Sequence, residues 1–468
     1  MTVIPTLRRA AVSLALLAAL CAAVAGCAKI RPLTAPPVER GSADFGIYVA
    51  MGANLTAGFQ SGGLAQRHQV LSYANLFAGQ AGTPRFTFPA VNLGGWPPLL
   101  KVASFGPPVV LDSAGVRGAF INPLRSPPAV LDSAYHNMGI PGALLADVLD
   151  PFLNYNIGLG RDASFFFNIA RQQGRPIPLS LLQLVRNKRP TFVSFEYGVN
   201  ELLGPAVRGS SAITMPAGPW ASLLHVTLDS MDINLPLAKK LILNVPDVTR
   251  LPFFNTVPPV ELTATGTPVI VAGVPTFLTG TGGLLQPGDL VTLSAVDSLK
   301  IGVGYQLGDI SYMSGAPVPG NGRPLPDRFV LTAAEQTTLK TAVNGYNAAI
   351  ANEATARGYA LVDLRGLLDG IITNGFKFAG VNYSAAYLTG GLFSVDGIHP
   401  TDLVHGLICN AMSDAVLEKF GARIPALDLA RLRTASSSSL SRARRSEAPG
   451  FMAAAIPLWR LGTPTGMP

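Results

Sequence analysis

Residues 46–63 constrain the fold more than any other stretch of the chain. Ile47 to Met51 is an apolar run that predicts a short buried strand, and it breaks at Gly52. The polar, glycine-rich segment that follows predicts a tight turn at the end of this strand. Open α/β sheets bind ligands at the carboxyl edge, where such turns lie. The stretch therefore predicts that Asn54 is presented at the edge of a sheet.

Other segments indicate that strands alternate with helices. Strands are predicted at 191–197, 240–248 and 359–364 from their apolar, β-branched and aromatic content. Thr332 and Glu335 form a capping box that predicts the start of a long helix ending near residue 358. This alternation is typical of an α/β fold with a mostly parallel sheet.

The length of the chain leaves room for insertions in one large domain. We expect the domain to span 45–425, with insertions at about 64–136, 154–190 and 251–330. The first insertion is rich in Pro and Gly and is expected to be irregular. The second is expected to be partly helical, and the third β-rich, because short alternating runs are separated by Gly and Pro.

The two ends of the chain have the composition of non-domain segments. Residues 1–26 combine a positive start with an apolar stretch and small residues, which predicts a signal peptide. The following Cys27 resembles the cysteine of a bacterial lipobox, which implies lipidation of its thiol and a cell-envelope protein, with outer-membrane anchoring favoured by Ala28. Residues 27–44 are expected to be a tether, and the Ser/Arg-rich residues 426–468 a disordered tail.

Charge and cysteine content indicate which partners and cofactors the chain is expected to lack. The formal charge of +8 would suit nucleic acid, but no stretch interleaves basic with aromatic residues, so no nucleic-acid partner is expected. The cysteines are Cys21, Cys27 and Cys409, which leave no intrachain disulfide once a signal peptide is removed. No set of side chains resembles a zinc site, and we expect neither a metal nor a cofactor.

Four segments in order resemble blocks of the SGNH/GDSL hydrolase superfamily. In the first, four residues match the family pattern: Gly52, Leu55, Thr56 and Gly58. Ala53 stands where the family has Asp, and Asn54 stands where it has the nucleophilic Ser. The resemblance therefore fails at the atom that performs the chemistry.

The other three blocks match more closely. Asn137 opens a block in which Gly142 is expected to give its backbone N–H to an oxyanion hole, and we expect a helix from this block toward residue 153. Asn200 matches the amide that feeds the same hole. Asp396 and His399 match the final block, in which the carboxylate orients the imidazole that acts as the base.

This resemblance implies a three-layer α/β/α sandwich with a flavodoxin-like sheet, and a membrane-anchored ester hydrolase scaffold acting on lipid or acetylated glycan. Because Asn54 has no activatable hydroxyl, activity is expected to be reduced or lost, with an acyl-ester or acetylated-glycan ligand still bound. Two alternatives stay open. The first is an active esterase in which His399 activates water, or in which Thr56 or Ser61 replaces the nucleophile. The second is a structural outer-membrane lipoprotein that binds a partner.

Overall fold

The computed structural model describes most of the expected domain. The described residues are 38–92, 94–104, 110–112, 117–120, 135–152, 163–170, 179–430 and 432. The expected signal peptide, Cys27, most of the tether and most of the C-terminal tail lie outside them, as do parts of the first two expected insertions.

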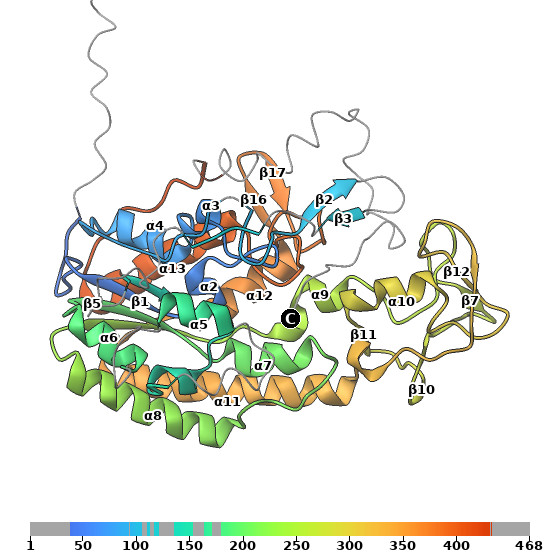
Figure 1. The fold of residues 1–468 in the computed structure, drawn as a ribbon, viewed down its shortest axis with the longest axis horizontal. Helices are drawn as coiled ribbons and strands as arrows, with labels where there is room; N and C mark the ends of the chain where they lie inside the picture. Colours follow the sequence, from blue (N-terminus) through green and yellow to red (C-terminus); the bar gives the residue numbers. More distant parts are fainter. Residues whose placement is uncertain are drawn as a thin grey trace, which may run out of the picture. The chain divides into compact units, whose positions relative to one another are not determined.

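A five-stranded parallel sheet forms the centre of the fold (Figure 1). Its strands are β1 (Tyr48–Gly52), β4 (Asn137–Gly139), β5 (Phe192–Glu196), β6 (Lys239–Leu243) and β15 (Ala360–Val362). Their order across the sheet is β15-β6-β5-β1-β4. Counted along the chain from the β4 edge, this is the order second, first, third, fourth, fifth, which is the flavodoxin-like arrangement. The expected fold class is confirmed.

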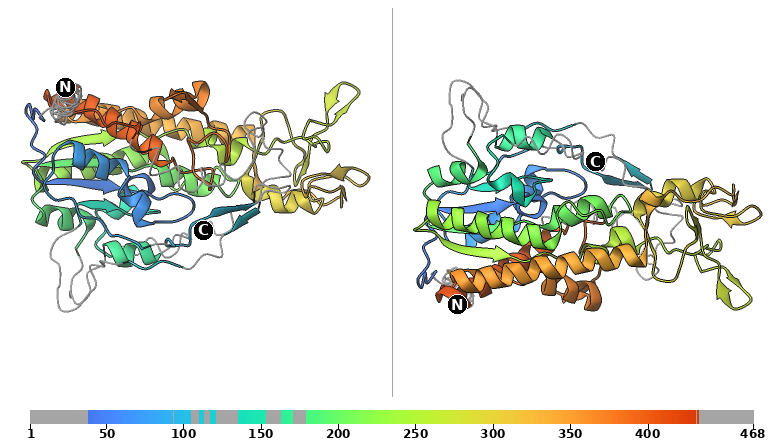
Figure 2. Two further views of the ribbon diagram at one scale, coloured as in Figure 1. Left: turned by 90° about the horizontal axis from the view of Figure 1, so that it is seen from above. Right: turned by 90° about the horizontal axis from the view of Figure 1, so that it is seen from below.

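Helices cover both faces of the sheet, which explains why β1 and β5 are buried along their whole length. One layer contains α4 (Tyr73–Gln80) and α13 (Asp402–Phe420), and the other contains α6 (Leu181–Asn187), α8 (Ala217–Asn234) and α11 (Ala333–Arg357) (Figures 1 and 2). The helix α11 begins at the predicted capping box, in which the side chain of Thr332 accepts from the N–H of Glu335.

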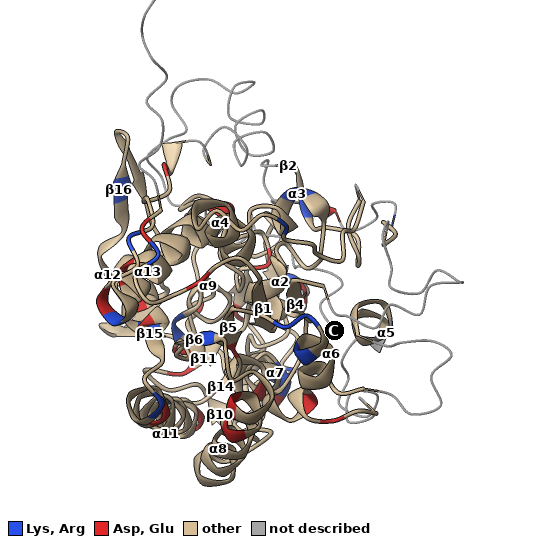
Figure 3. Ribbon diagram, turned by 90° about the vertical axis from the view of Figure 1, so that its left-hand side faces the viewer, with Lys and Arg blue, Asp and Glu red and all other residues tan. Residues whose placement is uncertain are grey.

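Ion pairs join α8 to α11 on the outer side of the second layer. Arg357 donates to Asp229 at 2.6 Å and to Asp232 at 2.8 Å. Figure 3 shows basic and acidic residues side by side at α11. Because the Arg357 side chain is only 13% exposed, this network contributes more to helix packing than an exposed pair would.

Short elements fill the connections. Single-turn and longer helices are α2 (Asn54–Ala57), α3 (Gln66–Gln69), η1 (Leu145–Val148), α5 (Ala163–Ile169), α7 (Val199–Ala206), η3 (Val248–Arg250), α9 (Pro252–Asn255), η4 (Leu293–Ala295), α10 (Val296–Lys300), η5 (Asp327–Phe329) and α12 (Leu364–Asn374). Antiparallel pairs are β2/β3 (Lys101–Ser104, Val110–Asp112), β7/β8 (Ile270–Val271, Val274–Pro275), β9/β10 (Thr279–Gly280, Gly283–Leu284), β11/β14 (Leu290–Val291, Val330–Leu331), β12/β13 (Ile310–Ser311, Val318–Pro319) and β16/β17 (Phe376–Phe378, Val381–Tyr383). Four of these pairs lie between residues 270 and 331, where a β-rich insertion was predicted.

Two local expectations are wrong. The segment that begins at Asn137 is not a helix but the edge strand β4, followed by a turn and the short η1. A Cβ on Gly139 would lie 2.2 Å from the backbone nitrogen of Ala57, so this strand packs directly on α2, a contact that sequence pattern does not show. The stretch 64–136 is not irregular throughout, because it contains α3 and α4.

Candidate active site

The site begins where β1 ends. Gly52 has no room for a side chain, since a Cβ there would lie 2.1 Å from Oγ1 of Thr56 and 2.8 Å from Oε2 of Glu196. The chain therefore turns tightly, and Asn54 becomes the first residue of the single-turn helix α2, which Gly58, with φ +76°, follows as its C-terminal cap. This places Asn54 at the carboxyl edge of the sheet, beside the point where strand order reverses.

A buried carboxylate holds this turn in place. Glu196, the last residue of β5, accepts hydrogen bonds from the backbone N–H of Ala53 at 3.1 Å and from Oγ1 of Thr56 at 2.9 Å. Burial raises the pKa of Glu196 to about 7, even though these hydrogen bonds act to lower it. Glu196 was not singled out from the sequence, although its place at the end of a predicted strand was a signal.

Thr56 is not available as a replacement nucleophile. Its side chain is fully buried, and its hydroxyl is hydrogen-bonded to Glu196 and, at 2.6 Å, to the hydroxyl of Tyr73. A nucleophile must instead face both the base and the substrate. The structure therefore contradicts the alternative in which Thr56 attacks an ester.

Asp396 and His399 form a buried pair in the loop before α13. Oδ2 of Asp396 lies 2.8 Å from Nδ1 of His399. The same carboxylate accepts from the hydroxyl of Ser394 at 2.8 Å, and from the backbone N–H groups of Gly62 and Ile398, both at 2.9 Å. These donors satisfy an ionised carboxylate without any contact with water, since Asp396 is 0% exposed. Sequence reasoning missed Ser394 and Gly62.

This environment keeps Asp396 negatively charged. Burial alone would raise the pKa of Asp396, but the charge of His399 and the hydrogen bonds from His399 and Ile398 lower it to about 2. An ionised carboxylate can only accept, so Nδ1 of His399 must donate to it. In the neutral imidazole, Nε2 of His399 then carries the lone pair that a general base requires.

The side-chain amide of Asn54 contacts all the expected site groups except Asp396. Its Nδ2 lies 2.9 Å from Nε2 of His399. Its Oδ1 accepts from the backbone N–H of Gly142 at 2.7 Å and from Nδ2 of Asn200 at 3.1 Å. The amide oxygen thus occupies the position expected for an oxyanion, while the amide nitrogen faces the base.

The orientation of this amide follows from its partners. Gly142 and Asn200 both present donors, which require an acceptor and therefore the oxygen of Asn54. Nε2 of His399 presents a lone pair, which requires a donor and therefore the nitrogen. Rotating the amide by half a turn would place two donors against its NH₂ group and an oxygen against the lone pair.

The two donors of the hole are themselves fixed. Asn200 lies in the first turn of α7, directly after β5, and its Nδ2 also donates to the backbone oxygen of Ala143 at 2.9 Å. Both amide hydrogens of Asn200 are therefore used. Gly142 has φ +81°, a conformation that glycine adopts without strain and that turns its N–H toward Asn54.

Aromatic side chains line one side of the base. The ring of Phe59 lies 4.8 Å from the imidazole of His399, and the ring of Phe165 lies 6.0 Å from that of Phe59. Both Phe residues are buried, whereas Asn54 is partly exposed and the His399 side chain is 11% exposed. The partly exposed polar groups therefore lie next to buried aromatic rings.

The structure thus brings all five expected site residues together at one edge of the sheet: Asn54, Gly142, Asn200, Asp396 and His399. They come from the ends of β1, β4 and β5 and from the loop before α13. Among the described residues, no group of three or more His, Cys, Asp or Glu side chains could hold a metal ion.

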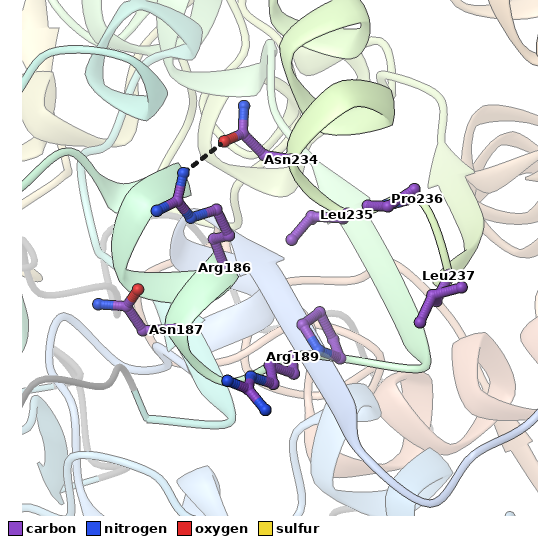
Figure 4. Close-up of a pocket in the computed structure, with 8 residues that line it drawn as sticks. Arg186, Asn187, Arg189, Asn234, Leu235, Pro236 and Leu237 are labelled. Carbon is purple, nitrogen blue, oxygen red and sulfur yellow. Dashed lines mark hydrogen bonds between the residues drawn. The ribbon is translucent and has the colours of Figure 1, made fainter.

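A separate cavity of about 540 Å³ lies at the opposite, amino edge of the sheet (Figure 4). Its walls come from the ends of α6 and α8 and from the loops that lead into β5 and β6, and include Arg186 and Arg189. One wall is closed by a 3.3 Å hydrogen bond from Arg186 to Asn234. None of the five site residues contributes to it.

The comparisons with known proteins give no sequence relative. Neither a protein-family model nor a curated protein matches the chain. Two solved structures are similar: a putative GDSL-like lipase from Parabacteroides merdae (TM-score 0.34, 10% identity, covering 81% of this chain and 98% of that chain) and an extracellular lipase from Streptomyces rimosus (TM-score 0.32, 13% identity, covering 79% and 98%). At such low values, the fold rests on its own strand order and the site on its own geometry.

Proposed function

We propose that the chain has the scaffold of an SGNH-type ester hydrolase in which Asn54 replaces the serine nucleophile, so that hydrolysis is strongly reduced or lost. The hydrogen bonds of the Asn54 amide to His399, Gly142 and Asn200 carry this proposal. They support it because an imidazole and two N–H donors surround the position from which a nucleophile would attack, as a base and an oxyanion hole would.

A serine at position 54 would complete the arrangement. Its hydroxyl would face Nε2 of His399, which would take the proton during attack on an ester carbonyl. Gly142 and Asn200 would donate to the resulting oxyanion, and Asp396 would stabilise the imidazolium. The Asn54 amide has no proton that the imidazole can remove usefully, because an amide nitrogen is not a nucleophile at neutral pH.

The alternative of an active esterase has less support. Hydrolysis of a bound ester by water would need the donors of Gly142 and Asn200, which the carbonyl oxygen of Asn54 occupies. Thr56 is buried and faces Glu196. Ser61 lies near the site, since its backbone N–H donates to Ser394, and it is the remaining hydroxyl that the sequence suggested.

A panel of short- and long-chain p-nitrophenyl esters tests the proposal. We expect the unaltered chain to be inert or nearly so, Asn54→Ser to hydrolyse at least one ester, and Asn54→Ser combined with His399→Ala to be inert. Full activity in the unaltered chain that survives Asn54→Ala would instead place the nucleophile elsewhere. Asn54→Ser that folds but stays inert on every ester would favour ligand binding without hydrolysis.

The proposed ligand is an acyl ester or an acetylated glycan. The apolar wall formed by Phe59 and Phe165 beside His399 favours an acyl chain over a sugar. A purely structural, partner-binding lipoprotein has no need for the donors, base and carboxylate to stay mutually hydrogen-bonded.

We also propose that the domain is tethered to a bacterial envelope membrane, most simply the outer membrane, through lipid on Cys27. Among the described residues, no helix is long and apolar enough to cross a bilayer. Mass spectrometry of the mature protein should show an acylated Cys27 at its N-terminus, and Cys27→Ser should release the protein from the membrane fraction. An unmodified N-terminus at another residue would contradict lipidation.

A further inference from the structure

We propose that Asn54 is itself a substrate of the site that surrounds it: its side-chain amide is hydrolysed in place to a carboxylate, with release of ammonia. The proposal concerns a covalent modification of the chain rather than turnover of an external ester. It rests on the distances around the Asn54 amide and not on the identity of any ligand.

The amide is held as an amide substrate would be held. Its carbonyl oxygen accepts from two fixed donors, the N–H of Gly142 at 2.7 Å and the amide of Asn200 at 3.1 Å. These donors withdraw electron density from the carbonyl carbon and stabilise the negative charge that grows on the oxygen when a nucleophile adds. The leaving nitrogen, which must receive a proton, lies 2.9 Å from Nε2 of His399.

Water is the only co-reactant that the reaction requires, and the partly exposed Asn54 side chain lies within its reach. The oxygen of water adds to the amide carbon, and Nε2 of His399, released from its hydrogen bond with the amide nitrogen, takes one of the protons of the water. The imidazolium then gives that proton to the amide nitrogen, and the carbon–nitrogen bond breaks. Ammonia leaves and takes up the proton of the new carboxylic acid, so that one amide and one water give one carboxylate and one ammonium ion.

The product suits the site better than the amide does. A carboxylate at position 54 keeps one oxygen on the donors of Gly142 and Asn200. Its second oxygen replaces the NH₂ group beside His399, where a protonated imidazole, already paired with Asp396, donates to it. The hydrolysed site therefore gains a charge-assisted hydrogen bond in place of a neutral one.

Asn137 provides a matched control within the same molecule. It lies in β4, next to β1, and is 1% exposed. Its Oδ1 accepts from the N–H of Gly139 at 2.9 Å, so its side-chain carbonyl is also hydrogen-bonded. Its Nδ2, however, donates to the backbone oxygen of Thr56 at 2.9 Å, which is no base. The two amides differ in access to a general base and to solvent, and only Asn54 is expected to react.

The test uses the full chain, purified and incubated in water enriched in the heavy oxygen isotope, with peptide mass spectrometry at intervals. We expect the peptide containing Asn54 to deamidate and gain one heavy oxygen, with aspartate and no isoaspartate, while the Asn137 peptide stays unchanged. Asn200→Ala should slow the reaction by about 10²–10³-fold, because it removes one oxyanion donor. His399→Ala should abolish it, with circular dichroism and thermal unfolding verifying that each variant is folded.

Three results would overturn the proposal. One is an Asn54 amide that persists as long as that of Asn137. Another is isoaspartate at position 54, which indicates attack by the backbone nitrogen of the next residue instead of water. The third is an unchanged rate in folded His399→Ala. Because the readout is the mass of position 54 in the unaltered sequence, failure of Asn54→Ser to hydrolyse esters leaves this test unaffected.

Discussion

The side-chain nitrogen of Asn54 lies 2.9 Å from Nε2 of His399, the imidazole nitrogen that faces away from Asp396. In a hydrolase that position belongs to a hydroxyl whose proton the imidazole removes. Here the position belongs to an amide, which cannot attack. Its nitrogen donates to the imidazole, and its oxygen accepts from Gly142 and Asn200. In the proposed function, the site therefore lacks only the nucleophile, and the Asn54 amide occupies the partners that a nucleophile and a substrate would use.

The proposed oxyanion role of Asn200 predicts a large effect on turnover. In the Asn54→Ser background, Asn200→Ala should lower kcat for a p-nitrophenyl ester by about 10²–10³-fold, since it removes one donor to the transition state. Asn234→Ala, at the opposite edge of the sheet, is the control and should leave kcat unchanged. An Asn200→Ala effect confined to KM would mean that the amide binds substrate without stabilising the transition state.

The buried Asp396 predicts a pH-dependent loss of stability. Its pKa falls from 3.8 to about 2 in the folded chain, so its contribution is fully present above the unfolded value and is lost as pH falls through about 2. A shift of this size corresponds to about 2 kcal/mol. Asp396→Asn should therefore lower the free energy of unfolding most near neutral pH, measured by urea denaturation. If Asp396→Asn lowers the free energy of unfolding by the same amount from neutral to strongly acidic pH, the lowered pKa of Asp396 is contradicted.

Glu196 predicts the opposite dependence. Burial raises its folded-state pKa from 4.5 to about 7, so the folded chain binds the extra proton between these values and stability falls as pH rises through them. Glu196→Gln keeps an acceptor for Ala53 and Thr56 but removes the titration. The free energy of unfolding of this variant should exceed that of the unaltered chain by an amount that grows from about pH 4.5 to about pH 7. A difference in the free energy of unfolding that does not change with pH would contradict the raised pKa of Glu196.

The contact between β4 and α2 predicts a steric effect. Gly139→Ala would place Cβ 2.2 Å from the nitrogen and 2.6 Å from Cα of Ala57, which are backbone atoms that cannot rotate away. We expect a loss of about 1–3 kcal/mol in the free energy of unfolding. Gly79→Ala, on α4 with no atom within 4 Å of the new Cβ, is the matched control and should be neutral or stabilising by up to about 1 kcal/mol.

The meeting of the site residues could be predicted because parallel strands bring their carboxyl ends to one edge, whereas the flavodoxin-like strand order was expected from the family resemblance alone. Asn54, Asn200 and the Asp396–His399 pair each follow a predicted strand or occupy a spacing that fits their contact. Glu196 was missed because its role depends on strand register, in which it lies opposite Gly52. The helix expected from Asn137 failed for a similar reason, since only the folded chain shows β1 pairing with that segment.

The central claim is that the site lacks its nucleophile and nothing else, and labelling with a fluorophosphonate tests it most directly. This reagent phosphonylates a serine hydroxyl only where a base and an oxyanion hole activate it. We predict that Asn54→Ser is labelled stoichiometrically on the peptide that contains position 54, and that adding His399→Ala abolishes the label. Labelling of the unaltered chain at Ser61, or a folded Asn54→Ser that takes no label, would contradict the account.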